Sequence, residues 1–262
     1  MSQYYKSYKH SVHFVQKIGE YMKKGFTLAE VLITLGIIGV VAAMTLPTLI
    51  QNHQKRSLEV ATQKFYSTMS QAVKKYMADE GVDDLRNTPL ASDNYEDSDS
   101  PEAIASIRNF VTKYLKVIEE CDHEANNCFA PVYRAWNGDV LKGDDDFTSG
   151  ANYDNYRDYA LVDGSTIRIG YFFSDHPIHL AVDVNGKNGP NRVGYDLWTM
   201  SIFYDGIIDE SGVIPECRKQ PYPEWCVNFF TVRKENYERC TESTVYGGCF
   251  GHFLENNFKF DY

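Results

Sequence analysis

One acidic side chain stands at the edge of a long uncharged stretch near the N-terminus. Glu30 directly precedes Val31 to Ile50, twenty residues without a charge. A carboxylate held at membrane depth costs about 3 kcal/mol, so its presence there indicates a partner. Cleavage after Gly25 would create that partner, the α-amino group of Phe26 in a neighbouring subunit. At low effective dielectric this attraction is strong enough to set the axial register of packed helices.

The uncharged stretch has the length of a membrane-spanning helix. Twenty helical residues rise about 30 Å, the thickness of one bilayer core. Lys23 and Lys24 precede the stretch and favour a cytoplasmic location for that end, which places the rest of the chain across the membrane. A secretory signal peptide would end in small residues after an apolar run of about 7–15 residues, and Leu46 to Ile50 do not resemble such a site. A plain signal anchor, with Glu30 touching lipid headgroups, stays open on composition alone.

The segment from Lys23 to Ala43, KKGFTLAEVLITLGIIGVVAA, resembles the cleavage and methylation motif of type IV prepilins and type II secretion pseudopilins. The resemblance implies cleavage after Gly25, N-methylation of Phe26, an assembly role for Glu30 and a helix kink at Pro47. It also implies several partners: a prepilin peptidase, a cytoplasmic assembly ATPase, an inner-membrane platform protein, membrane lipid and other pilin subunits. The precursor would be a single-pass inner-membrane protein that later joins a periplasmic or cell-surface filament.

The resemblance divides the chain into four parts. Residues 1–25 would be the leader, 26–50 the membrane and assembly helix, 51–80 its amphipathic continuation and 81–262 an extracytoplasmic head. The leader is longer than in many pilins, and a start at Met22 would leave only four residues before the cleavage site.

Apolar spacing and turn residues predict the architecture of the remainder. Leu58, Phe65, Met69, Val73 and Tyr76 recur at helical steps up to a stop at Gly81. An acidic loop over 79–102 leads to a short helix capped by Ser100, with Pro101 in its first turn. Four strands are expected at residues 158–162, 166–173, 178–184 and 197–204, and loop-like chain beyond Pro215. The expected fold class is α+β and pilin-like: a long N-terminal helix packed on a small antiparallel sheet, with a disulfide-rich C-terminal region.

Charge argues against one class of partner. The net charge is −10, and the first 25 residues carry five Lys and one Glu, so the remainder carries −10 − 4 = −14. Contact with a nucleic-acid backbone needs clustered Lys and Arg. No nucleic-acid partner is therefore expected.

The cysteines indicate an oxidising compartment. There are six cysteines, an even number, and all lie between residues 121 and 249. No CxxC pair occurs, so disulfides are favoured over zinc. Local pairing would join Cys121 to Cys128, Cys217 to Cys226 and Cys240 to Cys249, whereas a pattern joining Cys226 to Cys240 is also open.

One internal loop has the composition of a cation site. Oxygen side chains occur at Asp183, Asn185, Asn191 and Asp196, separated by glycines that permit a tight loop. Hard cations such as calcium take six to eight oxygens, some from backbone carbonyls. The loop resembles the Gly/Asn/Asp-rich loop of major pseudopilins, where calcium can stabilise the C-terminal region. Asx and Gly residues also build turns unaided, so no cofactor is required and calcium is one of two readings.

No catalytic motif occurs: GxSxG, HExxH, P-loop and GxGxxG patterns are all missing. We therefore expect no enzyme and no catalytic residue. The sequence favours a structural subunit of a type IV pilus or a type II secretion-like filament. The alternative is a single-pass, membrane-anchored binding protein that does not polymerise.

Overall fold

The computed structural model describes residues 25–90, 100–121, 128–142, 156–171 and 178–262. The leader, apart from Gly25, lies outside these residues. The chain forms two compact units, one ending at His53 and the other beginning at Gln54. A single helix, α2 (Leu28–Glu80), contributes residues to both units.

The part of α2 within the first unit is apolar, and no other element in the described part of the chain covers its large side chains. Its large side chains from Val31 to Ile50 are all exposed, and the helix is long and apolar enough to cross a membrane. The helix continues without a break through Pro47, where the sequence predicts a bend or a local opening. The missing proline N–H therefore does not end the helix there.

The part of α2 within the second unit buries the predicted stripe. Leu58, Phe65, Met69, Val73 and Tyr76 are all buried. The helix ends at Glu80, and Gly81 follows with φ of +70°, a conformation that glycine adopts without strain. The predicted stop is confirmed.

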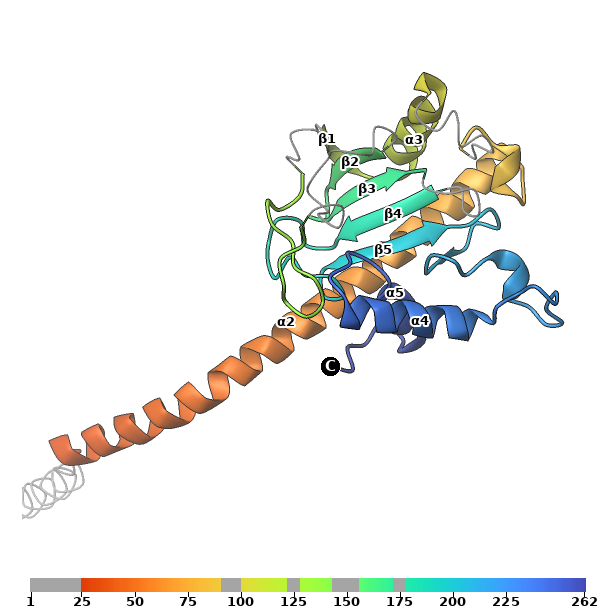
Figure 1. Ribbon diagram of the computed structural model, residues 1–262. Coiled ribbons are helices and arrows are strands. Elements are labelled where there is room, and N and C mark those ends of the chain that lie inside the picture. The colour runs from red at the N-terminus through yellow and green to blue at the C-terminus, as the bar shows by residue number, and fades with distance from the viewer. Residues whose placement is uncertain (1–24, 91–99, 122–127, 143–155, 172–177) are drawn as a thin grey trace, which may run out of the picture. The chain divides into compact units, whose positions relative to one another are not determined.

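The sheet of the second unit is a six-stranded antiparallel meander in chain order (Figure 1). Its strands are β1 (Val117–Cys121), β2 (Tyr156–Leu161), β3 (Thr166–Gly170), β4 (Ile178–Asp183), β5 (Leu197–Ile202) and β6 (Ile208–Asp209). The four predicted strands correspond to β2 to β5, and a short turn joins β2 to its antiparallel neighbour β3. The expectation of only four strands is wrong, because β1 carries two adjacent glutamates and β6 has only two residues. Neither gives an alternating pattern.

The helix α3 (Pro101–Tyr114) forms as the sequence predicts. The Ser100 hydroxyl accepts a hydrogen bond from the Ala103 N–H at 3.1 Å, and Pro101 occupies the first turn. Ile107, Phe110 and Val111 are buried, and α3 contacts β2 and β3.

The expectation of loop-like chain beyond Pro215 is also wrong. Helices α4 (Phe229–Glu242) and α5 (Phe250–Glu255) lie there. The buried residues of α4 are only Arg233 and Cys240, so this helix has no apolar stripe to detect. Arg233 is held instead by charge, because its guanidinium donates to both carboxylate oxygens of Asp209 at 3.0 and 2.7 Å.

Three local disulfides cross-link the second unit. They join Cys121 to Cys128, Cys217 to Cys226 and Cys240 to Cys249, with Cα–Cα distances of 5.7, 5.4 and 5.6 Å. The local pairing predicted from spacing is confirmed, and the alternative joining Cys226 to Cys240 is wrong. Cys121 is the last residue of β1.

An aromatic cluster fixes α5 on the sheet. The ring of Phe253 stacks on that of Trp198 in β5, with centroids 4.4 Å apart. We predict that Phe253→Ala lowers the free energy of unfolding by about 3–5 kcal/mol, because it removes a buried ring and leaves a cavity. Urea unfolding of the detergent-solubilised protein, followed by tryptophan fluorescence, measures the loss. Phe230→Ala is the control, because Phe230 is 55% exposed; equal losses for the two variants would contradict the packing described.

Candidate functional site

The predicted cleavage site lies just before α2. The side chain of Phe26 is 88% exposed, and a Cβ added at Gly25 would meet nothing within 4 Å. The fold itself therefore does not require glycine at this position. A requirement for glycine here would have to come from an enzyme that recognises this segment.

Glu30 and Thr27 form a reciprocal cap at the start of α2. The N–H and the hydroxyl of Thr27 donate to Glu30 Oε2 at 2.8 and 3.0 Å, and the Glu30 N–H donates to Thr27 Oγ1 at 3.2 Å. This is a capping box. Thr27 is not among the predicted site residues, although the pattern Thr-x-x-Glu before an apolar run is the recognised signal of a capping box. Glu30 thus already has a local partner, Thr27, which directly follows Phe26, the residue whose amino group cleavage would free.

Two buried carboxylates lie at the two ends of the connection from β4 to β5. Asp183 ends β4 and pairs with Leu197 at the start of β5, and both Asp183 and Asp196 have 0% exposure. Asp183 accepts hydrogen bonds from the Tyr133 hydroxyl at 2.6 Å and from the Asn185 N–H at 3.1 Å. Asp196 accepts two backbone N–H bonds at 2.7 Å, from Asn191 and Arg192. Tyr133, which lies 50 residues before Asp183 in the chain, gave no signal in the sequence.

Burial and mutual repulsion disturb the ionisation of this pair. Loss of water raises the pKa of both carboxyls, and the charge of Asp196 raises that of Asp183 further. Hydrogen bonds from Tyr133 and from backbone N–H groups oppose the rise without cancelling it. The two carboxyls therefore resist carrying two negative charges together.

The two predicted asparagines carry unsatisfied oxygens. Asn185 Oδ1 and Asn191 Oδ1 are both buried without a hydrogen-bond partner, a state that costs about 1–3 kcal/mol for each group. All four predicted oxygen donors lie on the one loop, and a hard cation would suit both the repelling carboxylates and the unpaired amide oxygens. Among the described residues, no three His, Cys, Asp or Glu side chains gather as a metal cluster. A cation here would therefore depend on amide and backbone oxygens as well as the two carboxylates.

Other side chains hold this loop in place. The Arg192 guanidinium donates to the Trp136 carbonyl oxygen at 2.8 Å and lies 4.4 Å from the centre of the Tyr195 ring. The Tyr262 hydroxyl donates to the Gly194 carbonyl oxygen. Trp136 and Tyr262 lie 56 and 68 residues away from their hydrogen-bond partners in the chain, so the sequence did not reveal these two contacts.

The fold and the N-terminal segment define a class of protein, in which a long helix with an apolar first part is followed in the chain by an α+β unit. Residues 21–46 match the prokaryotic N-terminal methylation motif, which is the signature of type IV prepilins and pseudopilins. The chain is thus pilin-like. Residues 48–139 match a family of unknown function (DUF6613). No curated protein and no solved structure matches the chain.

The buried carboxylates give a pH prediction for metal-free protein. Their folded pKa values lie above the ordinary value of 3.8, so their stabilising contribution is full below pH 3.8 and is lost as the pH rises through the folded values. We predict that Asp183→Asn reduces this loss, by up to about 1.4 kcal/mol per pH unit. Urea unfolding in EDTA at a series of pH values measures it.

Two features make that comparison specific. The buried carboxyl of Glu210 has its pKa raised to about 7 by burial, and it contributes a slope of the same sign to wild type and variant alike. Asp83→Asn, at an exposed position, controls for the loss of one negative charge. A slope that is unchanged in Asp183→Asn would contradict the repulsion described.

Proposed function

We propose that this protein is a structural subunit, a pilin or pseudopilin, of a type IV pilus or a type II secretion-like filament. One observation supports the proposal most: a prepilin signature stands at the start of a helix whose large apolar side chains from Val31 to Ile50 are all exposed. Such a surface needs lipid before assembly and neighbouring helices afterwards. The role is mechanical rather than catalytic, in keeping with a motif found on structural proteins.

The proposed maturation follows from the same segment. A prepilin peptidase cuts after Gly25 and methylates the new amino group of Phe26. An assembly ATPase and an inner-membrane platform then move the subunit from the membrane into the filament. The head, residues 81–262, lies outside the cytoplasm, where its three disulfides are stable.

Glu30 and Gly25 separate cleavage from assembly. We predict that Glu30→Ala is cleaved normally but enters filaments at least about tenfold less, because the carboxylate no longer attracts the Phe26 amine of a neighbouring subunit. Gly25→Val should block cleavage. Co-expression with a prepilin peptidase, N-terminal sequencing and a count of sheared filaments measure both steps.

Thr27→Ala is the matched control for the cap. It removes the hydroxyl that bonds Glu30 but keeps the carboxylate, so filaments should form if the charge pair is the essential function of Glu30. An uncut chain in the presence of the peptidase would support the alternative, an anchored binding protein that does not polymerise. Normal filaments from Glu30→Ala would contradict the charge-pair mechanism.

We further propose that the loop of residues 183–196 binds calcium. The buried, repelling pair Asp183 and Asp196 and the unpaired oxygens of Asn185 and Asn191 support this assignment. A divalent cation would relieve the repulsion and give the amide oxygens a partner. The cation would stabilise the connection between β4 and β5 and would take no part in a reaction.

Calcium should therefore raise the stability of the head. At 100 times its dissociation constant, we predict a gain of about 2.7 kcal/mol in the free energy of unfolding, and a larger gain at neutral than at acid pH because the ligands must be ionised. Thermal unfolding in EDTA and in calcium measures it. Asp196→Asn should abolish the gain, whereas Asp139→Asn, at an exposed position, should keep it. A gain that survives Asp196→Asn would exclude this loop as the site.

A further inference from the structure

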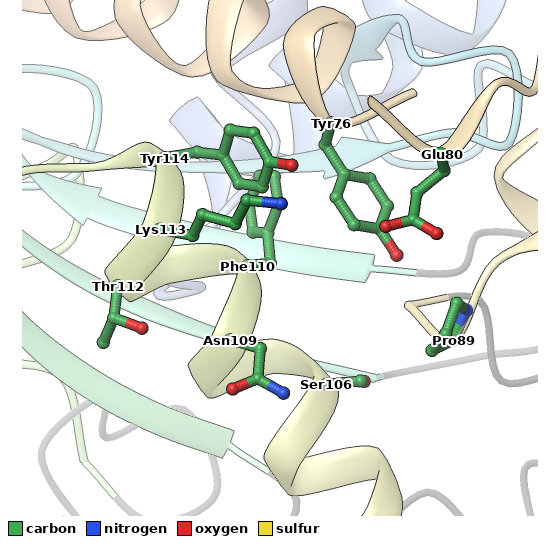
Figure 2. Close-up of a pocket in the computed structure, with 9 residues that line it drawn as sticks. All are labelled: Tyr76, Glu80, Pro89, Ser106, Asn109, Phe110, Thr112, Lys113 and Tyr114. Atoms are coloured by element: carbon green, nitrogen blue, oxygen red, sulfur yellow. The ribbon is translucent and has the colours of Figure 1, made fainter. Parts of the chain in front are cut away.

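A pocket between the end of α2 and α3 shows how charges are balanced at the surface of the second unit. It has a volume of about 420 Å³, with Glu80 on the α2 side and Lys113 on the α3 side (Figure 2). Lys113 Nζ lies 3.8 Å from Asp79 Oδ2, and Lys75 Nζ lies 3.7 Å from the same oxygen. These acidic and basic side chains are all exposed, so water and opposite charges stabilise them together.

Glu210, which directly follows β6, has the opposite surroundings. The residue is only 1% exposed. Its carboxylate accepts hydrogen bonds from the Ser211 N–H at 3.1 Å and from the Gly251 N–H, in the first turn of α5, at 2.9 Å. Both donors are neutral backbone groups, and no ion pair to Glu210 occurs within the described part of the chain. A buried carboxylate without a positive partner is costly to ionise.

The neighbouring arginines are paired with other carboxylates. Arg233 donates to both oxygens of Asp209 at 3.0 and 2.7 Å, and its remaining Nη1 lies 3.1 Å from Glu255 Oε1. Arg218 Nη1 lies 2.7 Å from Asp205 Oδ2, and Arg218 Nε lies 3.8 Å from Asp209 Oδ2. These two guanidinium groups are thus shared among three carboxylates, and neither is within ion-pair distance of the buried acid that follows β6.

Several elements bring charged or titratable groups to the region of Glu210 and α5. They are Asp209 on β6, Tyr66 on α2, Arg233 and Arg239 on α4, Glu255 and His252 on α5, and Arg218 on the segment between β6 and α4. Burial raises the pKa of Glu210 to about 7, and the charge of Asp209 raises it too. The N–H groups of Gly251 and Ser211 and the more distant charge of Arg239 oppose this rise. The neutral acid is therefore easier to bury here than the carboxylate.

The start of α5 packs tightly against Glu210. A Cβ added at Gly251 would lie 2.6 Å from Arg233 Cγ and 2.9 Å from Glu210 Cβ, so the backbone of α5 is held directly against this acid. Hydration of the carboxylate would break the contact with Gly251. Cys249 immediately precedes α5 and is bonded to Cys240 of α4, so a helix that moved away would stay attached to α4.

We propose that Glu210 is a pH-sensitive latch for α5. As the neutral acid it stays buried under the closed helix, and as the carboxylate it favours an open state in which α5 has moved away and water reaches the acid. The closed state binds the proton more tightly than the open state, so the closed state is most favoured at acid pH and loses that advantage as the pH rises. The latch is a property of the second unit and does not depend on whether the chain forms filaments.

Opening of the latch would uncover a face of α2. The ring of Tyr66 on α2 lies 6.0 Å from that of Phe250 in α5 and 5.2 Å from that of Phe258, which follows α5. Lys259 Nζ donates to Glu59 Oε2 of α2 at 2.9 Å. The segment that the latch holds therefore covers α2 with both apolar and charged contacts. A rise in pH would weaken this cover.

Hydrogen exchange of the detergent-solubilised full chain, in EDTA and followed by mass spectrometry, tests the latch. Protection is the exchange rate of an unstructured peptide divided by the measured rate at the same pH. The protection of α5 should fall up to about tenfold per pH unit from pH 4.5 to about 7 and then level off. Strands β3 and β4 report opening of the whole unit and should stay better protected than α5. Constant protection of α5, or protection equal to that of β3 and β4 throughout, would overturn the latch.

Three variants identify the group that titrates. Glu210→Gln keeps the size of the side chain but cannot ionise, so the protection of α5 should no longer change with pH. His252→Gln is the critical control, because histidine changes charge in the same pH range and His252 Nε2 lies 2.8 Å from Asp261 Oδ2. Glu238→Gln, at an exposed position on α4, controls for the loss of one negative charge.

The latch requires that both controls keep the slope of the wild-type protein. A wild-type slope in Glu210→Gln, or a slope that disappears in His252→Gln, would assign the titration to another group and overturn the proposal. If Glu210→Gln does not fold, the wild-type profile and His252→Gln decide. A slope kept in His252→Gln, with α5 less protected than β3 and β4, supports the latch, and its loss excludes it.

Discussion

The first half of α2 exposes apolar side chains from Val31 to Ile50 on every side of the helix. A surface of this kind is stable in lipid or against other apolar helices, and in neither place can a backbone group stay unpaired. The helix satisfies its own backbone, so it can leave one of these environments and enter the other without refolding. In the proposed filament subunit, the surroundings of this segment change while its conformation does not.

Glu30 is the charged residue at the start of this apolar segment, and its carboxylate needs a partner wherever the segment lies. In the single chain its carboxylate caps the helix through Thr27, an interaction worth about 1 kcal/mol. A positive amine in an apolar environment would attract the same carboxylate more strongly. The cap keeps the acid satisfied in the isolated subunit, and a neighbouring subunit could then compete for it. A helix end with a weak local partner is suited to exchange that partner during assembly.

The sequence was informative where a local pattern determined the structure. The long helix and its end at Gly81, the Ser100 cap, the strands β2 to β5 and the local disulfides followed from spacing, capping and turn residues. The edge strands were not predicted because β1 is acidic and β6 is two residues long. Helix α4 was not predicted because it is held by the pairing of Arg233 with Asp209 and has no apolar stripe. In the candidate cation loop, the oxygen donors were visible but their burial was not, since it depends on Tyr133 and on contacts with Trp136 and Tyr262.

The three disulfides share one property that bears on how the head matures. Each joins cysteines only seven or nine positions apart, so under the proposed topology each pair of thiols would emerge almost together from the membrane. Closing such short loops requires little of the remaining chain to be present or ordered. Oxidation can therefore proceed stepwise from the amino end, and no bond has to wait for a distant partner or be reshuffled afterwards. Under the proposed function, the disulfide-bonded unit can thus be completed before it meets another copy.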